Sequence, residues 1–319
     1  YSDYHATNIH GQVQAAVTVS IGSTSGAASC NTLWFGSGQR ANGDFGRVGT
    51  IDPTTYAATS KYTIDRLVDP TPGTNETMTT TGTAALAVDP LDPTQVYFAP
   101  RYVYQDGSYD MGGLHAYNSV TNTVSDQLTL WRDTPFTVRM GVDAEGTEWI
   151  VDNQGAIWRH ARGGTNWTGG AVLSTSNGYT FAPNQAMTLA SGDLAFDGLG
   201  NMWIIGSRQS DGTAFLYTVS KESLASDEPK AQLVGSMGKG EFNGIAFMED
   251  GTLWASTRDV DKNGNVTGGS KLWQVNKVTG KATQKAAYSN FQIEDLGSCA
   301  LPKPELAVEK TAALGDGVV

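Results

Sequence analysis

The chain has 319 residues and is acidic, with 21 Lys and Arg against 32 Asp and Glu, so its net charge is −11. This length suffices for one large all-β domain or two smaller ones. Only 17% of the residues are charged and 38 are glycine, a composition typical of secreted or surface β-proteins. Nucleic acids and anionic lipids attract clustered Lys and Arg, so the charge argues against both as partners. No apolar run reaches the length of about 18 residues that spans a membrane, so no membrane insertion is predicted.

One motif recurs along the chain, and each copy ends in an aromatic residue. The clearest copies are VDAEGTEW, FDGLGNMW and FMEDGTLW, which end at Trp149, Trp203 and Trp254. Trp34 and Tyr97 end two weaker copies, and from Tyr97 onward the aromatic residues lie 52, 54 and 51 positions apart. A period of about 50 residues with short strands and many turn residues is typical of a β-propeller.

Each copy predicts the same series of strands. A small-residue apolar strand comes first, at 85–88, 140–142, 193–196 and 244–247. The aromatic strand follows after a turn, and a third strand comes later, at 112–117, 155–160, 214–219 and 270–275. A polar fourth strand completes the unit. Because successive sheets converge on the axis of a propeller, we expect only small side chains to pack there.

The first copy is split between the two ends of the chain. NTLWF (31–35) matches the aromatic strand, and IEDLGSCA (293–300) supplies the inner strand that is missing before it. The ring is therefore expected to close by pairing of N-terminal and C-terminal strands. Five aromatic copies predict five blades, although the unassigned segments 12–22 and 65–84 could together form a sixth blade, or an outer strand and a loop.

The two cysteines lie at this break. Aligned on the other copies, Cys299 falls at the end of the inner strand and Cys30 at the start of the second strand. The repeat register therefore makes neighbours of two residues far apart in the sequence, and we expect a disulfide that locks the ring. Such a bond implies an oxidising compartment and a secreted protein. The alternative is two buried free thiols.

After the second cysteine the chain changes character, so we divide it into a propeller (1–302) and a linker with the first strand of a following module (303–319). The segment PELAVEKTAALGDGVV resembles the first strand of the immunoglobulin-like stalk repeats of large bacterial surface proteins. The matching residues are Leu306, Val308, Lys310, Thr311, Gly315 and Asp316.

The whole chain is similar to the propeller-like N-terminal head of Gram-positive, actinobacterial cell-surface adhesins. DLGSC followed by a Pro-containing linker, and repeats such as LWQVNKVTGKAT, carry this resemblance. The resemblance implies a secreted protein that is attached to the cell wall through a region beyond this chain. It also implies a monomeric head on a longer chain, with a glycan or a host or matrix protein as its partner.

A possible calcium loop lies at DVDKNGN (259–265). Asp259, Asp261 and Asn263 place oxygen ligands at alternating positions before a glycine, as calcium loops do. An EF-hand would carry an acidic residue at its twelfth position, where this chain has Ser270. Ca²⁺ is therefore one expectation, and a polar hairpin with an Asn-Gly turn is the alternative.

A second acidic loop, YQDGSYDMGG (104–113), occupies the same place in an earlier blade. Its aromatic and acidic side chains are suited to stacking on sugar rings and to hydrogen bonding with hydroxyl groups. We therefore name Tyr104, Asp106, Tyr109 and Asp110 as candidate ligand-binding residues. The alternative is a loop that is merely solvated.

The start of each inner strand should surround one mouth of the propeller axis. The register places there Ala85, Arg139, Asp193, Asn243–Gly244 and Glu294–Asp295. Of these, Arg139, Asp193, Asn243 and Glu294 form a mixed-charge cluster suited to a metal or a polar ligand. FNGIAF also resembles the inner-strand motif of calcium-dependent gluconolactonase-type propellers, in which acidic residues and asparagines hold the ion. The alternative is that the acidic side chains pair with Arg139 in a structural network.

These observations favour a non-catalytic adhesin head that binds a glycan or a matrix or host protein. The sequence contains no HExxH, GxSxG or P-loop motif, and its four histidines show no ligand spacing. The runner-up is a metal-dependent propeller hydrolase or lyase of the gluconolactonase type that works at the mouth. A third interpretation is a structural head that presents a fibrillar stalk.

Overall fold

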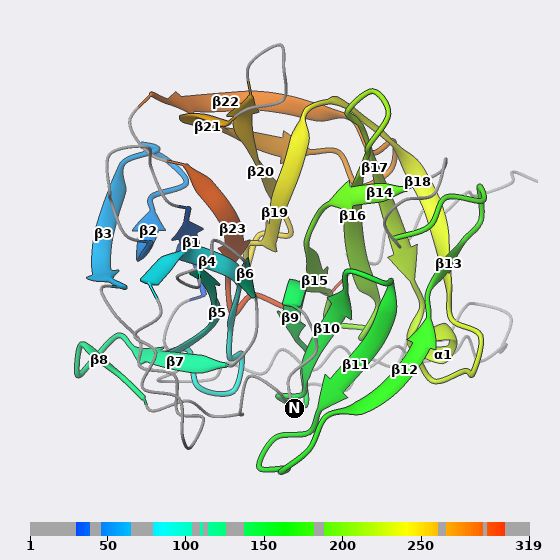
Figure 1. Cartoon of the computed structure of the whole chain (residues 1–319), viewed down its shortest axis with the longest axis horizontal. Coiled ribbons are helices and arrows are strands. Elements are labelled where there is room, and N and C mark those ends of the chain that lie inside the picture. The colour runs from blue at the N-terminus through cyan, green and yellow to red at the C-terminus, as the bar shows by residue number, and fades with distance from the viewer. Residues whose placement is uncertain are drawn as a thin grey trace, which may run out of the picture.

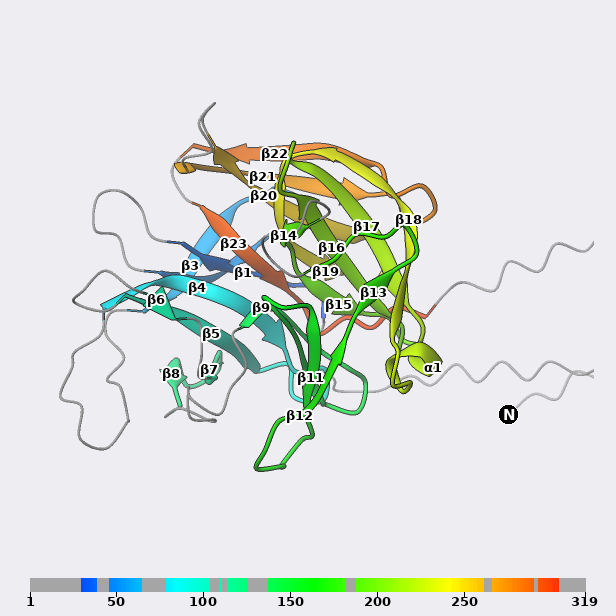
Figure 2. The ribbon, with the colours of Figure 1, turned by 45° about the vertical axis from the view of Figure 1, so that its right-hand side comes forward.

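A computed structural model describes most of the chain, namely residues 30–38, 46–64, 79–103, 109–110, 114–125, 137–181, 188–260, 266–289 and 292–303. Five small sheets, in which nearly all strand pairs are antiparallel, surround a central axis, as Figure 1 shows, and Figure 2 shows the same ring turned by 45°. The described part contains one short helix, α1 (Lys221–Leu224), which is far too short to cross a bilayer. The protein is therefore an all-β propeller with five blades.

The blades follow one another in chain order. Blade 1 consists of β23 (Ile293–Gly297), β1 (Leu33–Ser37), β2 (Arg47–Ile51) and β3 (Ala58–Thr63). Blade 2 consists of β4 (Thr79–Val88), β5 (Gln95–Val103), β7 (His115–Asn118) and β8 (Thr123–Val124), with β6 (Tyr109–Asp110) paired to β5. Blade 3 consists of β9 (Thr137–Val142), β10 (Glu148–Asp152), β11 (Ala156–His160) and β12 (Thr168–Val172).

The last two blades are built in the same way. Blade 4 begins with β14 (Leu189–Ser191) and β15 (Leu194–Phe196), which both pair with β16 (Met202–Arg208). It continues through β17 (Thr213–Val219), β18 (Lys230–Lys239) and β13 (Ser174–Thr175). Blade 5 consists of β19 (Glu241–Phe247), β20 (Leu253–Val260), β21 (Val266–Val275) and β22 (Ala282–Tyr288).

The predicted closure of the ring is confirmed. The inner strands β23, β4, β9, β15 and β19 contact one another in that order, and β19 returns to β23. Blade 1 is the composite blade, because C-terminal β23 pairs with N-terminal β1 in the register Trp34↔Gly297 and Phe35↔Leu296. The end of the unassigned segment 65–84 belongs to β4, and segments 12–22 and 65–78 lie outside the described residues. The five-bladed ring needs no sixth sheet.

The expectation that only small side chains pack at the axis is wrong at every second position. In each blade a Gly or Ala of the inner strand lies opposite the repeated aromatic residue, as in Gly141↔Trp149 and Ala246↔Trp254. The alternate positions carry larger apolar residues: Leu86, Met140, Leu194, Ile245 and Leu296. A Cβ added to Gly141 would lie 2.4 Å from Cδ1 of Leu194, so the small residue makes room for the leucine of the next strand.

These apolar side chains close the middle of the ring. The void that the inner strands enclose measures about 20 Å³, which is close to the size of one water molecule. The axis is therefore packed and not a pore. The structure accordingly offers two separate ends, the mouth where the inner strands start and the opposite end, called here the disulfide face.

The repeated motif is a turn whose aspartate is hydrogen-bonded by the indole of the tryptophan that ends the motif. Oδ1 of Asp143 accepts backbone N–H groups from its own turn, and the indole Nε1 of Trp149 donates to its Oδ2 at 2.7 Å. Asp197 makes the same contacts one blade later, with Trp203 Nε1 at 3.0 Å. The residue that completes the turn is Gly146 or Gly200, with φ of 77° or 81°, which explains the invariant spacing of Asp, Gly and Trp in these copies.

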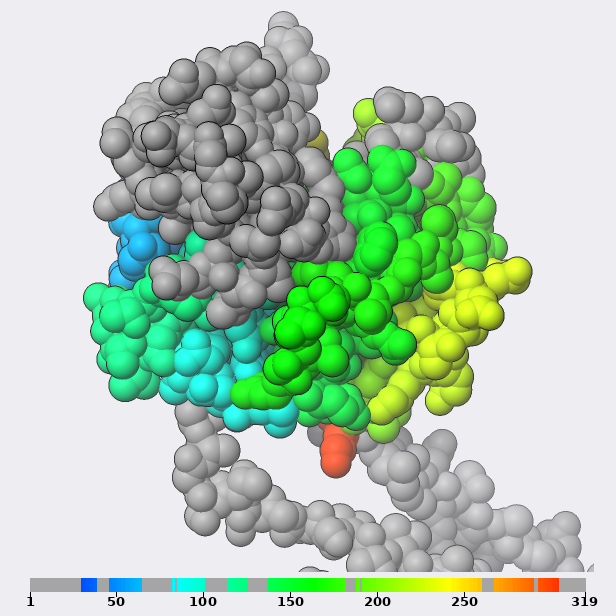
Figure 3. Space-filling model, turned by 60° about the horizontal axis from the view of Figure 1, so that its bottom comes forward, coloured from blue at the N-terminus to red at the C-terminus, as the bar shows by residue number. Residues whose placement is uncertain are grey.

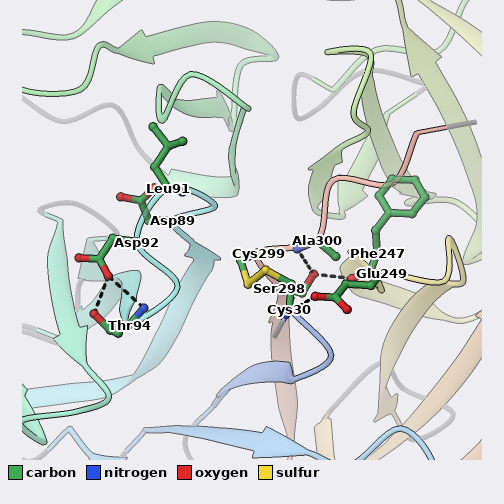
Figure 4. Close-up of a disulfide and its surroundings, with 10 residues drawn as sticks. All are labelled: Cys30, Asp89, Leu91, Asp92, Thr94, Phe247, Glu249, Ser298, Cys299 and Ala300. Carbon is green, nitrogen blue, oxygen red and sulfur yellow. Dashed lines mark hydrogen bonds between the residues drawn. A yellow bond between two sulfur atoms is a disulfide. The ribbon is translucent and has the colours of Figure 1, made fainter. Parts of the chain in front are cut away.

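In blade 1 the disulfide replaces this turn. Cys30 and Cys299 are bonded, with Cα atoms 5.1 Å apart, and Cys299 occupies the position that Asp143 and Asp197 hold in their blades (Figure 4). The chain then crosses the disulfide face to blade 4, where the N–H of Gly198 donates to the carbonyl of Pro302 at 2.8 Å. Figure 3 shows the last described residues (red) reaching the surface there.

Removal of the disulfide should lower stability. Cys30→Ser opens a covalent loop whose ends are 269 positions apart, for which the chain-entropy model gives an upper value of about 5 kcal/mol. We expect a lower melting temperature for the variant under oxidising conditions, measured by calorimetry. Wild-type protein in reductant is the matched control and should melt near the variant. Equal melting of oxidised wild type and variant would contradict the role assigned to the bond.

Candidate functional site

Five equivalent positions of the inner strands form one layer just below the mouth. By strand register these are Ala85, Arg139, Asp193, Gly244 and Asp295. The three charged side chains are completely enclosed, since their residues are at most 1% exposed. Asn243 and Glu294 lie one residue earlier, nearer the mouth.

Asp193 connects three blades. Its Oδ2 accepts the backbone N–H of Ile245 in blade 5 at 2.7 Å, and its Oδ1 accepts the N–H of Leu194 at 2.6 Å. It also accepts the backbone N–H of Met140 in blade 3. This one carboxyl group therefore holds its own inner strand against the strands on both sides.

Asp295 connects the remaining two blades. Its Oδ2 accepts the backbone N–H of Leu86 in blade 2 at 2.5 Å, and its Oδ1 accepts the N–H of Leu296 at 2.8 Å. The side chains of Asp295 and Asp193 are hydrogen-bonded to each other. We call these two residues the carboxyl pair; it joins all five inner strands across the axis.

A hydrogen bond between two carboxyl groups requires a proton. Burial raises the pKa of Asp193 to about 7, against the backbone N–H groups and the Asp295 hydrogen bond that lower it. Burial, together with the charge and hydrogen bond of Asp193, raises the pKa of Asp295 well above its ordinary value. The two carboxyl groups therefore titrate together, and burial favours the state in which they share one proton.

Arg139 completes the buried layer. Its guanidinium donates to the carbonyl of Leu189 at 3.1 Å and lies 4.8 Å from the ring centre of Phe181. Burial lowers its pKa to about 10, and the charges of Asp193 and Asp152 act in the opposite direction. It remains a cation at neutral pH and balances the charge of the carboxyl pair. Of the predicted mouth cluster, the structure thus places Arg139 and Asp193 in one internal network.

Asn243 and Glu294 belong to a second network at the mouth. Nδ2 of Asn243 donates to Oε2 of Glu294 at 3.3 Å. Arg258 of β20 bridges Oε2 of Glu241 at 2.5 Å and Oε2 of Glu294 at 3.3 Å. The buried Oδ1 of Asn243 has no hydrogen-bond partner within the described part of the chain. Sequence reasoning missed Arg258 and Glu241, which the register of the second and inner strands would have placed at this end.

The other predicted ligand residues are only partly visible. The carboxylate of Asp259 pairs with the ammonium of Lys271, while Asp261 and Asn263 lie outside the described residues. Tyr109 and Asp110 form β6, and Tyr104 and Asp106 lie outside the described residues. No three His, Cys, Asp or Glu side chains of the described ranges converge on one point that would suit a metal ion. Calcium binding therefore stays a prediction.

Two histidines of the third strands are packed as internal residues. His160 pairs with Glu148, and its Nε2 donates to the carbonyl of Gly164 at 3.0 Å. His115 stacks on Phe98 with ring centres 5.6 Å apart. Both are at most 8% exposed. Their surroundings give them a role in packing between strands.

A cleft that the sequence did not reveal lies between blades 5 and 1 on the disulfide face. Its volume is about 810 Å³. One wall consists of the β2–β3 turn at residues 52–57, and the other of Met248, Trp254 and Gln274 from blade 5. The walls come from opposite ends of the chain, so only the closed ring brings them together. One sequence signal exists: Met248 stands where two other copies of the motif carry Asp.

Comparison with known proteins gives no family. No protein-family model matches the chain, and no curated protein matches it. Among solved structures, TolB from Acinetobacter baumannii aligns at 8% identity with a TM-score of 0.44 over 86% of this chain and 67% of its own.

Two carbohydrate-active enzymes also align. An exo-β-1,3-galactanase from Clostridium thermocellum gives 10% identity and a TM-score of 0.43 over 64% of this chain and 48% of its own. The GH74 xyloglucanase from Xanthomonas campestris gives 17% identity and a TM-score of 0.39 over 81% of this chain and 38% of its own. This chain thus spans half or less of each of these two enzymes. At such scores the likenesses carry no functional argument.

The carboxyl pair should make stability depend on pH. Because the folded pKa values lie above the ordinary 3.8 of Asp, the folded state binds more protons, and the pair's contribution is complete below pH 3.8. It is lost as the pH rises through about 7. Asp295→Asn keeps a neutral donor beside Asp193, so we expect its unfolding free energy to fall less between pH 5 and pH 8 than that of wild type.

Chemical denaturation at the two pH values tests this expectation. Asp295→Ala is the comparison variant and should lose about 3 kcal/mol or more at both, because it leaves the Asp193 carboxyl buried without its partner. Parallel pH dependence in wild type and Asp295→Asn would show that the two carboxyl groups do not share a proton.

Proposed function

We propose that this chain is the non-catalytic head of a secreted cell-surface adhesin that binds a glycan or a matrix or host protein. The observation that carries the proposal is the contrast between the two ends of the ring. The acidic groups near the mouth are engaged with backbone N–H groups, Arg139 and Arg258. The cleft on the disulfide face instead offers a polar, open volume of about 810 Å³.

The location outside the cell is supported by the disulfide, since such bonds persist in oxidising compartments. We keep within this proposal the division into a propeller (1–302) and a linker that opens a stalk module (303–319), and attachment to the cell wall beyond it. Calcium binding by the 259–265 loop is also part of the proposal. Residues 304–319 lie outside the described residues.

A second candidate is a metal-dependent hydrolase or lyase that works at the mouth. It is favoured by the buried Oδ1 of Asn243, an acceptor with no partner within the described ranges. Two features weigh against it. Asp193 and Asp295 lie out of reach of a substrate because they are fully buried, and Glu294 is already bound by Arg258.

An array of glycans and matrix proteins tests the proposal, with the purified chain applied in calcium and again in chelator. We expect specific binding that Asn243→Ala leaves within about twofold. A parallel screen for lactone and glycoside hydrolysis should show no turnover. Turnover that Asn243→Ala abolishes would favour the enzyme, and a blank array in both conditions would overturn the adhesin.

A further inference from the structure

Trp254 departs from the pattern of Trp149 and Trp203, which end the two clearest other copies of the motif. In blades 3 and 4 the indole N–H of Trp149 and Trp203 donates to an aspartate. The indole N–H of Trp254 has no hydrogen-bond partner within the described part of the chain, and Trp254 lines the cleft between blades 5 and 1. A residue of the cleft wall therefore carries a polar donor without an acceptor among the described residues.

The cause is a single exchange within an otherwise identical turn. Met248 stands at the aspartate position, yet its N–H still donates to the carbonyl of Thr252 at 2.9 Å, as Asp143 N–H does to Thr147 and Asp197 N–H to Asn201. Gly251 has φ of 79°, like the glycines of the other turns. The turn thus keeps its backbone conformation, but the carboxylate that would accept the indole N–H is absent.

The opposite wall places an aromatic ring beside this indole. The ring of Tyr56 meets that of Trp254 edge to face, with centres 6.1 Å apart. Tyr56 has φ of 61°, a left-handed conformation that disfavours a residue with a bulky side chain. Hydrogen bonds of its N–H with Asp52 and of its carbonyl with Tyr288 hold it there, at 2.8 and 3.0 Å. Strain of this kind accumulates at ligand sites.

The remaining lining mixes donors and acceptors without a dominant charge. Gln274 lies directly opposite Trp254 in the β20–β21 pair, so both side chains share the face that lines the cleft. The Gln274 amide has no hydrogen-bond partner among the described residues. Asp52 and Asp250 supply two negative charges and Lys285 one positive charge. An indole N–H, an amide and an aromatic ring together suit a ligand with many hydroxyl groups and apolar ring faces.

The backbone argues for a sugar and against an extended peptide. Peptides that add to a sheet need unpaired main-chain N–H and C=O groups. Here β20 is paired on both sides, with β19 and β21, and β21 is paired with β20 and β22. Around Trp254 and Gln274 recognition must therefore come from side chains, and a peptide strand could add only at the outer strands β3 and β22, which carry the lining residues Thr59 and Lys285. A volume of about 810 Å³ lies within the ordinary range for ligand sites and accommodates a short oligosaccharide.

We propose that the cleft between blades 5 and 1 is an oligosaccharide-binding site in which Trp254 and Gln274 donate hydrogen bonds to sugar oxygens and Tyr56 contacts a ring. This inference rests on the proposed function as a binding head, and it names both the ligand class and the place. The site is distinct from the mouth and from the acidic loops that the sequence suggested.

The test compares variants on an array of neutral and sialylated oligosaccharides together with matrix proteins, followed by calorimetric titration of the best oligosaccharide. We expect Trp254→Phe and Gln274→Ala each to weaken binding about 3- to 10-fold, the effect of one lost hydrogen bond. Met248→Asp restores the aspartate of the other blades and should weaken binding similarly, because the new carboxylate accepts the indole N–H. Trp203→Phe is the matched control and should bind like wild type.

A second variant separates binding from folding. Tyr56→Asn suits the left-handed backbone, so it should lower affinity while the melting temperature stays near that of wild type. Oligosaccharide binding that survives Trp254→Phe, Gln274→Ala and Met248→Asp would show that the cleft is not the binding site. The proposed function as a binding head would still stand. Binding to matrix proteins alone would show that the ligand is not an oligosaccharide, and the proposed function as a binding head would again stand. A blank array would overturn both proposals.

Discussion

The hydrogen bond between Asp193 and Asp295 is the interaction on which the ring depends. Strands of a propeller pair within blades, so the blades themselves are held together mainly by side-chain packing. The carboxyl pair adds hydrogen bonds across the axis, because its oxygens accept N–H groups of Leu86, Met140 and Ile245 from three further inner strands. Burial of two carboxyl groups is costly, and a shared proton, these N–H groups and the cation of Arg139 offset that cost.

This central layer also shows why the repeat is imperfect. One position in five blades carries Ala85, Arg139, Asp193, Gly244 and Asp295, so no symmetry survives there. Geometry explains the glycine: a Cβ at Gly244 would lie 2.4 Å from Oγ of Ser256 and 2.7 Å from the backbone nitrogen of Leu296. A single pair of acids can span the axis only if its neighbours are small or oppositely charged.

The repeat made the blades, the inner strands and the cysteine pairing predictable, because each depends on a local pattern and a register. The choice between adjacent residues was harder, since a shift of one position turns a strand residue to the other face. Glu294 therefore looked equivalent to Asp295, although only Asp295 joins the buried layer. The cleft could not be predicted from the sequence, because its walls, near residues 52–57 and 248–285, come together only in the closed ring. Met248, in the place of the motif's aspartate, was the one sequence signal for the cleft.

Ring closure and the cleft are physically connected. The backbone N–H of Cys30 donates to Oε1 of Glu249 at 2.5 Å, which ties the start of blade 1 to the β19–β20 turn of blade 5. Asn31 follows Cys30, Met248 precedes Glu249, and both Asn31 and Met248 line the cleft. The disulfide therefore fixes one side of the opening between these blades as well as the ring. The two departures from the repeated aspartate, Cys299 and Met248, thus lie at one seam, where the first locks the blades and the second leaves a donor for a ligand.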